Sequence, residues 1–177
     1  MSDHESRFPA SQRPNSWLPR RVDGPPGAVS PRCHMVVGCQ RHPVSRAALN
    51  YAIDLAPRLN AFVHVVHVVD IVDTPINPDS ADWEQRVAET LDIGRRDACA
   101  QLAALSGNWA YYTLTGDPAH ELARIADNHD ATMIVLGAAR SGAAAVLGRL
   151  LGRSVAARLI RRAHRPVLVV PAPLENP

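Results

Sequence analysis

The stretch that decides the fold is TMIVLGAARSGAAAVLGRLLGRSVAARLIRRAHRPVLVV, residues 132–170. It begins with a short apolar run that ends at Gly137 and closes with a second apolar run at residues 166–170. Between the two runs lie a loop of small residues and a segment in which Val155, Leu159 and Ala163 recur at helical spacing. The order strand, loop, helix, strand is typical of a parallel sheet, in which a helix carries the chain back to the next strand.

The same alternation extends toward the N-terminus. The segment at residues 61–69 is dense in β-branched residues and too short for a surface helix, which favours a strand buried on both faces. We therefore predict an α/β fold, an open five-stranded parallel sheet with helices on both faces, Rossmann-like in its layers. The remaining strand-type runs are residues 35–39 and 109–114, and helical spacing is found at residues 44–59, 83–105 and 118–126.

The 177 residues suffice for one domain and a tail. Residues 1–32 contain six prolines and almost no apolar periodicity, so burial of these residues cannot offset their chain entropy. We predict a disordered tail over residues 1–32, a domain over residues 33–173 and a short C-terminal tail over residues 174–177. Met35, directly before the first apolar run, offers an alternative start of the chain.

The composition excludes several enzyme classes. Every one of the 19 Lys and Arg residues is an arginine, and Walker A loops, protein kinases and Schiff-base enzymes all need a lysine. A net charge of +2 gives no argument for a nucleic-acid or membrane partner, so neither is expected. The three cysteines lack zinc-ligand spacing and no apolar run approaches the length of a membrane helix, so we expect a cytoplasmic protein.

In open parallel sheets, ligands bind at the carboxyl ends of the strands, where the strand order reverses. Cys39 and Gln40 follow the first predicted strand, and Gly137 follows the fourth. Ser154 stands where the next helix begins, and a helix N-terminus carries a partial positive charge that suits a phosphate. Arg140 can pair with a phosphate through its guanidinium fork, or it is a solvated loop arginine.

In their order and spacing, these segments resemble the universal stress proteins. That family places a strand, the pattern G-x2-G-x9-G-[S/T], a helix and a last strand of the type P-V-L-V-V in this order. Nine residues separate Gly142 from Gly152, Ser154 follows shortly after, and residues 166–170 read PVLVV. The resemblance covers roughly residues 33–171.

The resemblance implies the fold of the adenine nucleotide alpha-hydrolases and a bound adenine nucleotide such as ATP, AMP or cAMP. Magnesium is expected only together with such a nucleotide. Gln40 stands where the family usually has an aspartate, and four residues instead of two separate Gly137 from Gly142. With Arg140 added from its own chemistry, the candidate binding residues are Cys39, Gln40, Val68, Gly137, Arg140, Gly142, Gly152, Ser154 and Val155.

We predict a regulatory binding module of the universal stress type and not an enzyme of high turnover. An apolar edge strand can pair with a copy of itself, and the resemblance also implies dimers built through the last strand, from Pro166 to Val170. Two alternatives stay open. One is a nucleotide-independent interaction module, expected if the altered loops close the crevice. The other is weak ATPase activity, for which the two loops offer no general base.

Two smaller predictions concern polar side chains. Asp117, followed by Pro118, is typical of the residue that caps a helix N-terminus. His64 and His67 lie three positions apart in a predicted strand, so they face opposite sides of the sheet and cannot share a metal ion. No metal site and no catalytic residue are predicted.

Overall fold

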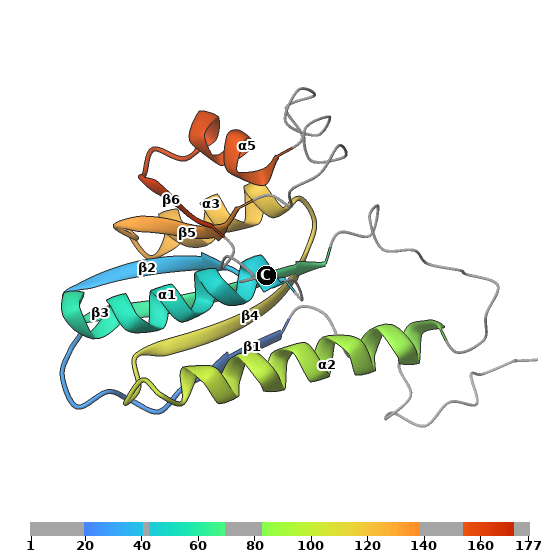
Figure 1. Ribbon diagram of the computed structural model, residues 1–177, viewed down its shortest axis with the longest axis horizontal. Helices are drawn as coiled ribbons and strands as arrows, with labels where there is room; N and C mark the ends of the chain where they lie inside the picture. The colour runs from blue at the N-terminus through green and yellow to red at the C-terminus, as the bar shows by residue number, and fades with distance from the viewer. Residues whose placement is uncertain (1–19, 41–42, 70–82, 139–153, 172–177) are drawn as a thin grey trace, which may run out of the picture.

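The computed structural model describes residues 20–40, 43–69, 83–138 and 154–171. Within these residues, six strands form one sheet in the order β1-β4-β3-β2-β5-β6 (Figure 1). Strands β2 to β6 pair in parallel, and β1 pairs with β4 in the antiparallel sense. The bounds are β1 (Arg20–Asp23), β2 (Cys33–Gly38), β3 (Ala61–Val69), β4 (Trp109–Thr115), β5 (Met133–Gly137) and β6 (Val167–Val170).

Helices cover both faces of this sheet (Figure 1). On one face, Leu49 and Leu102 anchor α1 and α2 in an apolar core, and on the other face Leu122 and Leu159 anchor α3 and α5. None of the described helices combines the length and the apolar character that a membrane span requires. The helix bounds are α1 (Pro43–Leu59), α2 (Trp83–Leu102), α3 (Pro118–Asn128) and α5 (Val155–Arg162).

The predicted α/β fold with a mostly parallel sheet and helices on both faces is confirmed. Strands β2 and β3 lie in the middle of the sheet, and Val36, Val37, Val63 and Val65 have no exposed surface. Consecutive valines face opposite sides of a strand, so full burial of both members of a pair requires a helix layer on each side. The β-branched runs are therefore explained by their central position.

The predicted number of five strands is wrong, because β1 adds a sixth. It lies within residues 20–32, which the sequence predicts to be part of a disordered tail. The backbone N–H of Gly24 donates to the carbonyl of Trp109 at 2.9 Å, and Asn60 Nδ2 donates to the carbonyl of Ser30 at 2.9 Å. Hydrogen bonds to partners far along the chain therefore hold this segment in place. Val22 is the only residue of β1 that is not exposed, so no apolar pattern in the sequence marks β1 as a strand. Residues 1–19 lie outside the described residues.

The strand order reverses between β2 and β5. From β2, strands β3 and β4 extend the sheet in one direction, and β5 and β6 extend it in the other. Chain crossovers on the two sides of such a point leave a crevice at the carboxyl ends of the strands. This crevice lies where Gly38 ends β2 and Gly137 ends β5.

Candidate functional site

A cavity of about 260 Å³ lies at the carboxyl ends of β2, β3 and β5. Its position matches the place where the reversal of strand order predicts a ligand site. Side chains and backbone from all three strands and from three helices line it. The lining residues are Gly38, Cys39, Gln40, Val44, Ser45, Val66, Val68, Pro118, Leu122, Leu136, Gly137, Ala138, Ser154, Val155 and Ala156.

The inner wall of the cavity is apolar. Val66 and Val68 come from β3, Leu136 comes from β5 and Leu122 comes from α3, and each is less than 9% exposed. Because Val66 and Val68 are two positions apart, they face the same side of the sheet. A wall of this kind, with few polar groups at its rim, is typical of sites for flat organic ligands.

Three helices begin at the rim of the cavity. Val44 lies in the first turn of α1, Pro118 begins α3, and Val155 begins α5. The first backbone N–H groups of a helix have no partner within the helix and carry a partial positive charge, which favours an anion. Ser154 caps α5, since its Oγ accepts from the backbone N–H of Ala157 at 3.5 Å.

Two glycines let the elements around the cavity approach one another closely. A Cβ on Gly38 would lie 2.5 Å from Cδ2 of Leu136, and a Cβ on Gly137 would collide with the carbonyl oxygen of Val44. Any larger residue at position 137 would therefore push the start of α1 away from β5. The glycine predicted from the family pattern has a packing role in addition to any contact with a ligand.

Asp117 joins two of the helices that border the cavity. One carboxylate oxygen accepts from the backbone N–H of His120 at 2.8 Å, which confirms the predicted cap of α3. The other oxygen accepts from Nη2 of Arg158 in α5. Gly116, directly before the cap, has a φ of +123°, a conformation that residues with a side chain rarely adopt.

Cys39 is the one cysteine among the residues that line the cavity. Burial raises the pKa of its thiol to about 11, and the nearby Cys99 adds to the shift. The thiol is therefore protonated at neutral pH and is a poor nucleophile. Its chemistry at this position is that of a small, largely apolar side chain.

Six of the nine predicted binding residues line this one cavity. They are Cys39, Gln40, Val68, Gly137, Ser154 and Val155. The other three, Arg140, Gly142 and Gly152, lie outside the described residues. Sequence reasoning missed Val66, Leu122 and Leu136 in the inner wall. The position of Val66 two residues before Val68 is a signal that could have found it, whereas Leu122 reaches the cavity only through the packing of α3.

The comparisons with known proteins agree with this geometry. A family model described as the universal stress protein family matches residues 32–171. A universal stress protein of Methanocaldococcus jannaschii is 32% identical over 135 residues, which cover 73% of this chain and 76% of that protein.

Solved structures of similar proteins share the fold. A universal stress protein solved in complex with cAMP has 26% identity and a TM-score of 0.58, over 80% of this chain and 98% of that chain. A family protein from Burkholderia pseudomallei has 30% identity and a TM-score of 0.59, over 79% of this chain and 96% of that chain. With the family model spanning the whole described sheet except β1, and with its relatives built on the same layers, this chain belongs to the universal stress protein family.

Proposed function

We propose that this chain binds an adenine mononucleotide in the cavity at the carboxyl ends of β2, β3 and β5. The observation that carries the proposal is the meeting of an apolar inner wall with three helix N-termini at one crevice. A purine base needs an apolar wall, and phosphate groups favour helix N-termini. At about 260 Å³, the cavity is near the lower end of ligand sites, roughly 300 Å³ and above, which favours a mononucleotide over a dinucleotide.

The similar structure solved with cAMP supports the adenine nucleotide class, because it shares 26% of its residues and most of its length with this chain. In the proposed complex, the base lies against Val66, Val68 and Leu136. Gln40 is exposed just after β2, and its side-chain amide can donate hydrogen bonds to a ribose and accept hydrogen bonds from it. The phosphates lie toward Ser154 at the start of α5.

The proposed activity is binding without rapid turnover. Two carboxylates, Asp117 and Glu121, directly adjoin lining residues in the sequence. The oxygens of Asp117 accept hydrogen bonds from His120 and Arg158, and Glu121 accepts from Arg124. A carboxylate held in this way is a structural group and is poorly placed to activate water. Ligand binding would instead change the contacts among α1, α3 and α5, whose first turns all border the cavity.

Calorimetric titration of ATP, ADP, AMP and cAMP into the full chain, with and without magnesium, tests the proposal. We expect saturable binding of at least one nucleotide with a stoichiometry of one. A matched pair of variants locates the site: Ala156 lines the cavity, and Ala157, the next residue of α5, does not. Ala156→Leu should weaken binding at least tenfold and Ala157→Leu should leave it unchanged. Absence of binding up to millimolar nucleotide would reject the proposal.

A second proposal concerns assembly. We propose that the chain forms a homodimer in which the edge strand β6 pairs with its copy. β6 ends the sheet on the side away from β1, and Val169 is 41% exposed on it. An apolar edge strand with free backbone groups is a template for pairing. Ile160 of α5 is 64% exposed and would extend the apolar contact. This dimer would also serve the alternative function of an interaction module that needs no nucleotide.

A further inference from the structure

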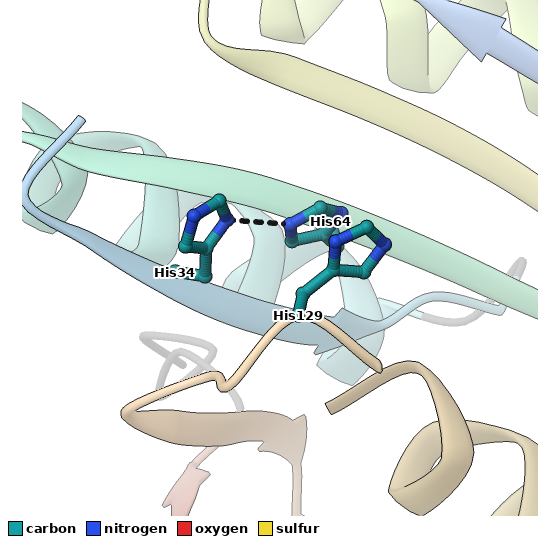
Figure 2. A group of neighbouring side chains, drawn as sticks. All are labelled: His34, His64 and His129. Atoms are coloured by element: carbon teal, nitrogen blue, oxygen red, sulfur yellow. Dashed lines mark hydrogen bonds between the residues drawn. The ribbon is translucent and has the colours of Figure 1, made fainter. Parts of the chain in front are cut away.

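Three histidines converge on the α3 side of the sheet, away from the cavity. His34 lies near the start of β2, His64 lies in β3, and His129 is the C-terminal cap of α3 (Figure 2). One ring nitrogen of each histidine lies within 4.8 Å of a ring nitrogen of the other two. The nucleotide cavity borders the opposite end of α3, so this cluster plays no part in the proposed function.

A chain of hydrogen bonds connects the cluster. Nδ1 of His34 and Nε2 of His64 are 2.9 Å apart, as the dashed line in Figure 2 marks. Nδ1 of His64 is 3.2 Å from the hydroxyl of Tyr112, and that hydroxyl is 3.3 Å from Nε2 of His129. The rings of His64 and His129 stack with their centroids 4.0 Å apart. Each histidine thus has at least one nitrogen turned toward another member of the cluster.

His64 lies in the middle of the cluster and is only 1% exposed. Its two ring nitrogens face His34 and Tyr112. A neutral imidazole has one nitrogen with a lone pair, which is the form that binds metal ions.

Tyr112 gives this arrangement a feature of metal centres. A histidine that binds a metal through one nitrogen usually donates its other N–H to a fixed partner, which sets the tautomer and the ring orientation. His64 can donate from Nδ1 to the Tyr112 hydroxyl, which leaves the lone pair on Nε2, the nitrogen that faces His34. The ring of Tyr112 is itself fixed by the guanidinium of Arg21, 5.3 Å from its centroid.

We propose that His34, His64 and His129 bind one divalent transition-metal ion of the zinc class, with Tyr112 orienting His64. Three imidazoles and one open position for water form a common tetrahedral set for Zn²⁺. The ion would take the place of the hydrogen bond between His34 and His64. Where a ring must present its other nitrogen to the ion, its proton would only move from one nitrogen of that ring to the other. The charge of Arg21 nearby is offset by its ion pair with Asp23 at 2.6 Å.

Metal entry requires small movements, which the exposure of the cluster allows. Ligand nitrogens around Zn²⁺ lie about 3.4 Å apart, since each Zn–N bond is about 2.1 Å, so the 2.9 Å separation of His34 and His64 must widen. The stacked ring of His129 must tilt so that its lone pair points at the ion. His34 and His129 are both partly exposed, and His129 follows the last turn of α3, where the backbone can adjust.

Metal titration of the full chain, without an affinity tag and after treatment with a chelator, tests the proposal. We expect Zn²⁺ to bind with a stoichiometry of one and to raise the melting temperature. Co²⁺ in its place should give the intense visible absorption of a four-coordinate ion. Ala156→Leu, which blocks the nucleotide cavity, should leave Zn²⁺ binding unchanged, so the two proposals fail or succeed separately.

Three variants locate the site. His129→Ala should lower Zn²⁺ affinity at least tenfold, whereas the exposed His120→Ala and His164→Ala should leave it unchanged. Should His129→Ala fail to fold, His129→Gln keeps a group that can bond to Tyr112 and removes the imidazole. A folded His129 variant that binds Zn²⁺ as tightly as the unchanged chain would overturn the proposal, as would equal losses in the two control variants.

Discussion

Arg158 in α5 donates a hydrogen bond to the carboxylate of Asp117, although the two residues lie 41 positions apart in the chain. The same carboxylate caps α3. One side chain therefore fixes the start of α3 and ties it to α5, and both helices border the cavity at the carboxyl ends of the strands.

The two roles of Asp117 can be separated by substitution. Asp117→Ala should lower the free energy of unfolding by about 1–2 kcal/mol, because it removes both the cap and the ion pair. Asp117→Asn keeps an effective cap and removes the charge, so it should cost only about 0.2–1 kcal/mol, as should Arg158→Ala. Urea unfolding of the three variants measures these differences. Equal losses in Asp117→Ala and Asp117→Asn would show that the cap contributes nothing.

Gln40 offers a test of the ribose contact. In place of the neutral amide, the carboxylate of Gln40→Asp accepts charge-assisted hydrogen bonds from ribose hydroxyls, and we expect about a tenfold gain in adenosine affinity. Gln40 is exposed, so the change should leave stability unaltered. Free adenine, which lacks ribose, is the control ligand. Calorimetry that shows the same gain with adenine and adenosine, or none with either, would contradict the contact.

The raised pKa of Cys39 predicts how its alkylation depends on pH. With a pKa of about 11, only about one thiol in ten thousand is ionised at pH 7, and the thiolate is the reactive form. In a Cys33→Ala, Cys99→Ala background, burial, the larger cause of the shift, still raises the pKa of Cys39. The rate with iodoacetamide should therefore rise about tenfold per pH unit from pH 7 to 9.5 without reaching a plateau. Circular dichroism at each pH checks that the chain stays folded. A rate that levels off as the pH passes 9 would show an unshifted thiol, whose pKa is 9.0.

Occupation of the cavity should also protect this thiol. Cys39 is a lining residue of the cavity, and its side chain packs against the core under α1 and α2. A bound nucleotide would cover this end of β2 and hinder the opening that lets the reagent reach the thiol. We expect saturating nucleotide to slow alkylation several-fold at pH 9. The Ala156→Leu variant, which should bind nucleotide weakly, is the control in which the same nucleotide gives no protection.

The proposed dimer depends on the exposed face of β6. Val169→Lys places a charge on the apolar edge, which opposes strand pairing, and should convert a dimer to a monomer. Val29→Lys is the matched control, because Val29 is 63% exposed in the segment between β1 and β2, far from β6 in the strand order. Sedimentation equilibrium of both variants measures the mass. A Val169→Lys protein that keeps the mass of the unchanged chain would reject pairing through β6.

Local patterns in the sequence are sufficient for most of the fold. The valines of β2 and β3 indicate strands buried on both faces, and Asp117 with Pro118 indicates a helix start. Once the sheet is parallel, the general rule for such sheets places a site at the carboxyl ends of the strands. This rule is why the sequence predicts that Ser154 lies near Cys39 and Gln40, although more than a hundred residues separate it from them.

The patterns fail where an element has no apolar signature of its own. β1 reads RRVD and follows a proline-rich segment, so its composition indicates a tail. It is a strand because β4 offers an unpaired edge, on which Arg21 also lies over the ring of Tyr112. The predicted inner wall of the cavity is incomplete for a similar reason, since Leu122 is indistinguishable in sequence from any other core residue of an amphipathic helix.

The sequence by itself determined the order of the strands and helices after β1, the parallel part of the sheet and the end that carries the crevice, because periodicity and burial on both faces are properties of short segments. Only the tertiary structure decided which distant polar side chains meet. His34 and His64 are 30 positions apart, and they become hydrogen-bond partners because β2 and β3 are adjacent in the sheet and in one register. His129 joins them because α3 packs across both strands, and no local pattern encodes that contact.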